Sequence, residues 1–349
     1  MRDEHLLGQL IVMGLPGPRL TDGLRNLVRK IQPGGYIMFT RNLASPEQVH
    51  SLITELQSLS KEPVMFTVDQ EGGRVSRLKV IGEEPPSASE LRKYGGLEVC
   101  QQHGKLMGQV QAALGFNLDL APVVDYCLSE EADNSLRGRC FGTNPDETIE
   151  KADAFLKGMQ AEGVHGTAKH FPGYTFCELD PHGDLPLITR SKEELENNEL
   201  RVFKYFADKA DAFMIGHGHF TAYHQESIPA SLSPVLIQDV LRGQLGFKGV
   251  VMTDDLEMGA VANRYGSEEA TRLAMKAGED LLLLCHNPAC VEIAFDTLKA
   301  MPDADVSRAV EAVSNYRKTL RRPPEKFDSD RFQEINAAIR AFRVLIRGA

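Results

Sequence analysis

Short apolar runs recur along the chain, and each is about as long as a β-strand. They lie at residues 9–14, 34–39, 64–69, 116–125, 166–171, 212–217, 249–254 and 281–286. Their nearly continuous apolar character is typical of strands buried on both faces of a parallel sheet. Amphipathic stretches with helical periodicity separate most of these runs, at residues 45–60, 97–115, 146–163, 191–209, 233–246 and 267–279. The pattern therefore predicts strands and helices in alternation.

This alternation favours an α/β fold of the (β/α)8 TIM-barrel type over residues 1–302. A doubly wound parallel sheet is the alternative, because the pattern does not fix the number of strands. Beyond residue 302 only helical patterns remain, at 305–322 and 328–348. We expect a single barrel domain with a C-terminal helical extension, residues 303–349, packed on the barrel.

Titratable residues stand where several of the predicted strands end. They are Asp69, Lys169, His170, His217 and Asp254. The carboxyl ends of the strands in a (β/α)8 barrel meet at one rim, so these side chains should share one pocket. Residues 166–186 also carry Asp180 and His182 among glycines and prolines, which indicates an irregular loop over that pocket rather than a helix.

Composition and charge narrow the classes of protein and partner. The 349 residues, 42% of them hydrophobic, can form a large core. A net charge of −10 without any cluster of Lys or Arg argues against a nucleic-acid partner. The N-terminus lacks signal-peptide features and no apolar run reaches the roughly 18 residues of a membrane span, so we expect a cytoplasmic protein without membrane contact. The six cysteines show no metal-binding spacing, and we expect no cofactor. Nothing in the sequence predicts an oligomeric state.

Four motifs follow one another along the chain, at residues 68–78, 169–173, 180–186 and 229–258. Their sequences are VDQEGGRVSRL, KHFPG, DPH with a following LP, and the long stretch from PASLSP to TDDLEM. In this order and spacing they resemble glycoside hydrolase family 3, specifically its β-N-acetylhexosaminidase branch. The resemblance runs from about Gly8 to Asn287. It implies a (β/α)8 domain that removes terminal β-linked N-acetylglucosamine, including from peptidoglycan fragments recycled in the cytoplasm.

The resemblance also implies roles for individual residues. Asp254 corresponds to the nucleophile, and His182, supported by Asp180, corresponds to the acid/base. The implied sugar-binding residues are Asp69, Arg77, Arg139, Lys169 and His170. We add His217 because it follows a predicted strand, although a buried structural histidine is an equal alternative.

These residue types suit glycoside hydrolysis on chemical grounds. A carboxylate beneath the anomeric carbon and a proton donor at the leaving oxygen are what an oxocarbenium-like transition state needs. An isolated Asp side chain has a pKa of ~3.9 and is ionised at neutral pH, so an Asp suits the first role. An imidazole titrates at ~6.5, so a His can hold a proton at neutral pH without the large pKa shift that a carboxylic acid would need. The predicted reaction is retaining hydrolysis through a covalent glycosyl-Asp254 intermediate.

The loop between the second and third motifs departs from the family pattern KHFPGHGDTxxDSHxxLP. Tyr174, Thr175, Phe176 and Cys177 stand in place of HGDT, and Pro181 replaces the Ser between the Asp and the His. The spacing to the catalytic candidates is unchanged. These replacements bear on the leaving-group preference and on loop movement, for which Gly173 and Gly183 are the candidate hinges.

Several alternatives stay open at this point. Asp254 and Asp255 both suit a helix N-cap after a strand, and for Asp255 a structural role is favoured. A reactive thiol at Cys177 is less favoured than a passive one. For the whole protein the alternatives are a family 3 β-glucosidase, a phosphorolytic N-acetylglucosaminidase and a non-catalytic sugar-binding relative. The joint presence of Asp180, His182 and Asp254 favours an enzyme, because a binding protein needs neither a proton donor nor a nucleophile.

Overall fold

The structure is a computed structural model and describes residues 4–60, 62–128, 135–177 and 183–348. Within these residues, eight parallel strands close into one barrel in the order β1-β12-β11-β9-β7-β6-β3-β2. Their bounds are β1 Ile11–Gly14, β2 Gly35–Met38, β3 Met65–Val68, β6 Leu118–Asp119, β7 His165–Phe171, β9 Ala212–Ile215, β11 Val250–Asp255 and β12 Leu281–Leu284. Each predicted apolar run contributes one of these strands. The predicted barrel is confirmed, and the doubly wound sheet is excluded.

The barrel closes where the first strand meets the last. Ile11 of β1 pairs with Leu282 of β12, and Met13 pairs with Leu284. Both strands are fully buried along their length, because one set of side chains fills the barrel and the other packs under helices. Two small sheets lie outside the barrel. They pair β4 (Gln70–Gly72) with β5 (Val75–Ser76) and β8 (Leu187–Ile188) with β10 (His219–Phe220).

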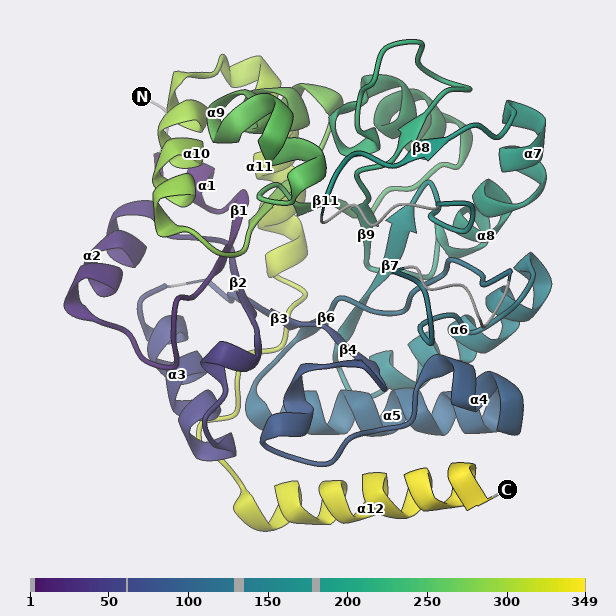
Figure 1. Ribbon diagram of the computed structural model, residues 1–349. Helices are drawn as coiled ribbons and strands as arrows, with labels where there is room; N and C mark the ends of the chain where they lie inside the picture. Colours follow the sequence, from purple (N-terminus) through teal and green to yellow (C-terminus); the bar gives the residue numbers. More distant parts are fainter. Residues whose placement is uncertain (1–3, 61, 129–134, 178–182, 349) are drawn as a thin grey trace.

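Helices surround the barrel on all sides in the ribbon view (Figure 1). They are α1 Glu4–Gly8, α2 Asp22–Ile31, α3 Pro46–Ser58, α4 Ala88–Tyr94, α5 Leu97–Leu114, α6 Pro145–Gln160, α7 Lys192–Asn197, α8 Glu199–Phe206, the π-helix η4 Val235–Gln244, α9 Gly259–Ala277, α10 Pro288–Ala300, α11 Asp303–Arg317 and α12 Ser329–Gly348. Short 3₁₀ turns occupy η1 Thr40–Asn42, η2 Arg77–Val80 and η3 Ala230–Leu232. The side chain of Ser45 caps α3 by accepting the N–H of Gln48. The predicted helix at 191–209 is instead two helices, because Asn198 has a non-helical backbone.

The last two helices pack against different parts of the barrel. α11 contacts α1 and α9, whereas α12 lies along α5 and α4, as the yellow helix in Figure 1 shows. The ring of Phe342 on α12 stacks on His103 of α5 with centroids 6.1 Å apart. The predicted domain boundary at residues 302 and 303 stays a prediction. Among the described helices, none is both long enough and apolar enough to cross a membrane.

Candidate active site

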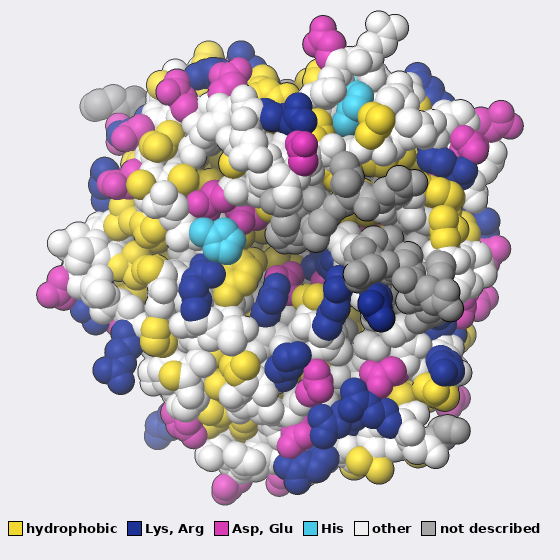
Figure 2. Space-filling view, in the orientation of Figure 1, with side chains coloured by type: hydrophobic (Ala, Val, Ile, Leu, Met, Phe, Trp, Pro, Cys, Tyr) yellow, Lys and Arg dark blue, Asp and Glu magenta, His cyan; other side chains and the backbone are white. Residues whose placement is uncertain are grey.

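A cavity of about 320 Å³ opens at the carboxyl ends of the barrel strands. Its volume is at the lower end of the range for small-molecule sites. The lining residues include Phe39, Asp69, Arg77, Arg139, Lys169, His170, Tyr174, Asp254, Asp255, Glu257, Cys285 and His286. Basic side chains gather along one side of a hollow near the centre of the face in Figure 2. The structure therefore brings six of the predicted site residues to one place: Asp69, Arg77, Arg139, Lys169, His170 and Asp254.

A network of ion pairs forms one wall of the cavity. The ammonium of Lys169 lies 2.9 Å from Asp69 Oδ1 and 2.7 Å from Glu71 Oε1. The guanidinium of Arg139 binds both oxygens of Glu71 at 2.8 Å, and Arg77 lies 3.2 Å from Asp69 Oδ2. The fork-on-carboxylate geometry fixes the orientation of Arg139 as well as its position. The side chains are thus held rigidly, with polar groups at the cavity surface.

The network keeps its carboxylates ionised although they are buried. Burial favours the neutral form of Asp69, but the charges of Lys169 and Arg77 outweigh it and hold the pKa of this carboxyl well below its usual range. Burial of Glu71 is likewise outweighed by Arg139 and Lys169, which lower its pKa to about 2. At neutral pH the wall therefore presents fixed charges that largely compensate one another.

His170 lies between this network and the buried carboxylate of Asp125, which is outside the network. Its Nε2 lies 3.3 Å from Arg139 Nη2, and its Nδ1 lies 2.8 Å from Asp125 Oδ2. Arginine can only donate, so Nε2 is the acceptor and Nδ1 carries the proton that is donated to Asp125. The other oxygen of Asp125 accepts the backbone N–H of Tyr174 at 2.6 Å. Asp125 thereby fixes both the ring of His170 and the start of the variant loop.

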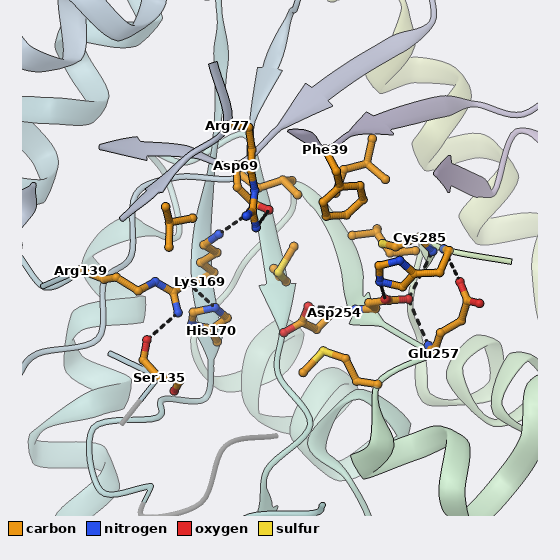
Figure 3. A pocket seen from close by; sticks show the side chains of 18 of the residues that line it. Phe39, Asp69, Arg77, Ser135, Arg139, Lys169, His170, Asp254, Glu257 and Cys285 are labelled. Carbon is orange, nitrogen blue, oxygen red and sulfur yellow. Dashed lines mark hydrogen bonds and ion pairs between the residues drawn. The ribbon is translucent and has the colours of Figure 1, made fainter. Parts of the chain in front are cut away.

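Asp254 and Asp255 take different environments at the end of β11. Asp254 lies between His170 on one side and Glu257 and Cys285 on the other, and its carboxylate is partly exposed to the cavity (Figure 3). Asp255 is buried; its Oδ1 accepts the N–H of Glu257, and its Oδ2 lies 3.2 Å from His286 Nε2. Burial raises the pKa of Asp255 to about 7. Asp254 is therefore the carboxylate of this pair that a substrate can reach directly.

His217 follows β9 and does not line the cavity. The side chain is fully buried and is not among the lining residues. Its Nε2 donates to the carbonyl of Asp255 at 2.9 Å, and its Nδ1 accepts the hydroxyl proton of Ser231 at 2.8 Å. In this placement His217 supports the strand end that carries Asp254 and Asp255, as the alternative of a structural histidine implies.

The predicted acid/base His182 and its partner Asp180 lie outside the described residues, as does Pro181. Their roles stay predictions. The four residues that stand in place of HGDT precede them in the chain and are described. Each of the four is buried or contacts a neighbouring side chain or backbone group. Thr175 Oγ1 accepts the N–H of Tyr126, and the ring of Phe176 lies under the guanidinium of Arg190 at 3.9 Å. Tyr174 and Cys177 are buried. Residues 174–177 therefore form a well-packed segment after the end of β7.

Sequence reasoning missed three groups that shape the site. Glu71 lies inside the first motif, but nothing in the pattern distinguishes it from an exposed loop residue. Asp125 is the last residue of the apolar run 116–125, so the same signal that identified Asp69 could have found it. His286 also ends an apolar run; its ring stacks on Phe39 with centroids 5.5 Å apart. Among the described residues, no group of three or more His, Cys, Asp or Glu has a metal-binding arrangement.

Glu71→Gln tests whether the buried network carries charge as described. We expect the free energy of unfolding at neutral pH to fall by about 3 kcal/mol, because Lys169 and Arg139 lose the carboxylate between them. The folded pKa of about 2 lies below the ordinary value of 4.5, so the contribution of Glu71 is present above pH 4.5 and is lost as the pH falls toward 2. The variant should lose less stability than the parent over that range.

Urea unfolding of the two proteins across this acid range measures both effects. Glu193 is exposed, so Glu193→Gln is the matched control and should follow the parent protein. Equal pH dependence in Glu71→Gln and the parent would contradict the charged network.

Comparisons with known proteins identify the family of the chain. The family model described as the glycosyl hydrolase family 3 N terminal domain matches residues 3–316. A protein of Alkalilimnicola ehrlichii named beta-hexosaminidase is 34% identical over 307 residues, which is 86% of each chain. A fungal multi-domain GH3 beta-N-acetylglucosaminidase matches with a TM-score of 0.92 and 27% identity, over 99% of this chain but 43% of that one. Native NagZ from Neisseria gonorrhoeae matches with a TM-score of 0.82 and 26% identity, over 97% of both chains.

Proposed function

The chain belongs to glycosyl hydrolase family 3, and from this premise we propose that it is a retaining exo-β-N-acetylglucosaminidase. The observation that carries the proposal is the position of Asp254. Its carboxylate reaches the cavity at the end of β11, across from the buried network of Lys169 and His170 (Figure 3). Covalent glycoside hydrolysis requires a carboxylate that can reach the anomeric carbon, and the hydrogen-bonding groups opposite Asp254 can hold the sugar in place for the attack.

The wall of the cavity suits a neutral sugar. Its charges are paired with one another in Lys169–Asp69, Lys169–Glu71, Arg139–Glu71 and Arg77–Asp69. A group that is already paired gains little from a charged ligand but can still exchange hydrogen bonds with hydroxyl and amide groups. Because the side chains of Arg139 and His170 have fixed orientations, they can hydrogen-bond only to sugar hydroxyl groups that stand at matching positions.

In the proposed reaction Asp254 attacks the anomeric carbon from below while a donor protonates the glycosidic oxygen. The bond from the anomeric carbon to Asp254 forms as the bond to the leaving group breaks. Water then attacks the same carbon, the ester bond to Asp254 breaks, and the carboxylate is restored. By the family resemblance the donor in the first step and the base in the second is His182, with Asp180 as its partner.

Turnover of two aryl glycosides tests the proposal. We expect the 4-nitrophenyl β-N-acetylglucosaminide to be cleaved with a kcat/KM at least about 100-fold above that of the β-glucoside, since the site should hydrogen-bond the acetamide. Added inorganic phosphate should leave the rate and the free-sugar product unchanged. Faster cleavage of the glucoside would assign the chain to the β-glucosidases, and formation of a sugar 1-phosphate would make it a phosphorylase.

We further infer that the enzyme works in the cytoplasm on N-acetylglucosamine-terminated fragments such as those of peptidoglycan. Support for the compartment comes from the cysteines. All six lie in the described residues and are free thiols, and five of them are buried. Fractionation of the native host that placed the activity outside the cytoplasm would contradict this inference.

A further inference from the structure

Of the four described residues that stand in place of HGDT, Tyr174 is the one that lines the cavity. Its side chain is only 2% exposed, and its ring lies 5.0 Å from that of His170. The phenol rests directly on the backbone after β9. A methyl group built on Gly216 would lie 2.5 Å from both the Cζ and the hydroxyl of Tyr174. The hydroxyl is therefore held at a fixed point of the cavity floor.

That point is beside Asp254. In the parallel pair of β9 and β11, Ile215 stands opposite Thr253. Gly216 directly follows the end of β9, and Asp254 is the next residue of β11. Adjacent strands lie about 5 Å apart, so the hydroxyl above Gly216 is a neighbour of Asp254 on the same rim. Tyr174 and Asp254 both line the cavity.

The hydrogen bonds of Tyr174 leave its proton available for that neighbour. The hydroxyl oxygen accepts the backbone N–H of His217. Its other hydrogen-bonding capacity is the O–H proton, which can only be donated. Burial raises the pKa of this phenol well above its usual value, and the charge of Asp254 raises it further. The phenol thus stays protonated and is a permanent hydrogen-bond donor.

Among the described residues, the carboxylate of Asp254 accepts only the N–H of Asp255. We propose that Tyr174 is a positioning residue for Asp254 and that, in the substrate complex, this carboxylate also accepts the hydroxyl proton of Tyr174 in a hydrogen bond. The inference rests on the proposed function, because it assumes that Asp254 is the nucleophile. The hydrogen bond orients the carboxylate for attack. It also stabilises the charge that returns to Asp254 when the ester bond breaks in the second step. Loss of the bond should therefore slow departure of Asp254 from the anomeric carbon.

Tyr174→Phe tests the role, because it removes the hydroxyl and keeps the ring against His170 and Gly216. With an activated aryl N-acetylglucosaminide we expect kcat to fall by about 10- to 100-fold and KM to fall as the glycosyl-enzyme accumulates. A burst of aryl alcohol should appear. The acid limb of kcat/KM should move to higher pH, because the ionised form of Asp254 loses a donor that favours it.

Tyr126→Phe is the matched control. Tyr126 is buried beside the same loop, with its ring at the edge of Phe176, but it does not line the cavity. The Tyr126→Phe variant should keep the kcat and the pH profile of the parent. A Tyr174→Phe protein with unchanged kcat, KM and pH profile would overturn the inference, and so would one that loses only thermal stability.

Labelling of Asp254 separates this failure from failure of the proposed function. A 2-fluoro glycosyl donor should attach to the peptide that contains Asp254 in both the parent and Tyr174→Phe. Labelling of Asp254 with parent-like kinetics in Tyr174→Phe would reject the role of Tyr174 alone. Labelling of another residue would reject the proposed nucleophile and, with it, the inference.

Discussion

Asp254→Ala is expected to lower kcat/KM by about four orders of magnitude or more while the protein stays folded. Asp254 stands at the end of β11 with its carboxylate partly exposed, and the only described hydrogen bond to it comes from the N–H of Asp255. Removal of the Asp254 carboxylate therefore leaves few buried polar atoms without a hydrogen-bond partner. The loss should be chemical rather than structural, and circular dichroism with thermal unfolding checks that the fold is kept.

Added azide sharpens this test. Azide is small enough to enter the space left by the carboxylate, and it should restore part of the activity of Asp254→Ala by forming a glycosyl azide. Asp255→Ala is the comparison. Asp255 ties the ends of β11 and β12 together through Glu257 and Cys285, so its loss should not be rescued by azide. Product of inverted stereochemistry from the parent enzyme would exclude the double-displacement scheme.

His182→Ala is expected to depend on the leaving group. A disaccharide with a poor leaving group should lose about 100- to 10,000-fold in kcat/KM, because its oxygen needs a proton to depart. An aryl glycoside with an acidic phenol needs little protonation and should lose at least tenfold less. Asp180→Asn should weaken the same step to a smaller degree, since the amide keeps most of the shape but not the charge.

A series of aryl N-acetylglucosaminides with graded phenol pKa measures the effect directly. The dependence of kcat/KM on leaving-group pKa should steepen in His182→Ala. Asn263→Ala is a useful control, because Asn263 donates a hydrogen bond to the carbonyl of Gly183 but cannot protonate a leaving group. If His182→Ala cleaved the disaccharide as fast as the parent, the donor would have to be sought elsewhere.

The barrel could be predicted from the sequence because strands buried on both faces leave an unbroken apolar signature. The run at 281–286 and the run at 64–69 are equally clear, although β12 and β3 lie in different parts of the barrel. The helices were less predictable. The stretch 191–209 has one amphipathic pattern, yet the non-helical backbone of Asn198 divides it into α7 and α8. The helices α1, α2, α4 and α10 were not predicted.

From the sequence, only those site residues could be predicted that stand at the ends of apolar runs. Asp69, Lys169 and Asp254 do so, and the structure brings them to one cavity. Glu71 gives no such signal. Its role depends on its ion pairs with Lys169 of β7 and with Arg139 of the loop after β6, which are distant in the sequence. His217 gives the signal without lining the cavity. A strand end fixes where a side chain starts, but the neighbouring strands decide whether it reaches the surface.

The pairing of β1 with β12 has a consequence for how the protein is made. Ile11 finds its partner only when Leu282 has left the ribosome, so the barrel cannot close during most of synthesis. Until then β1 and the newest strand both present unpaired edges, which other chains could join. Contacts between such distant residues also form slowly. A chain that ends before residue 281 would keep those edges permanently, and it should aggregate rather than fold into a smaller barrel.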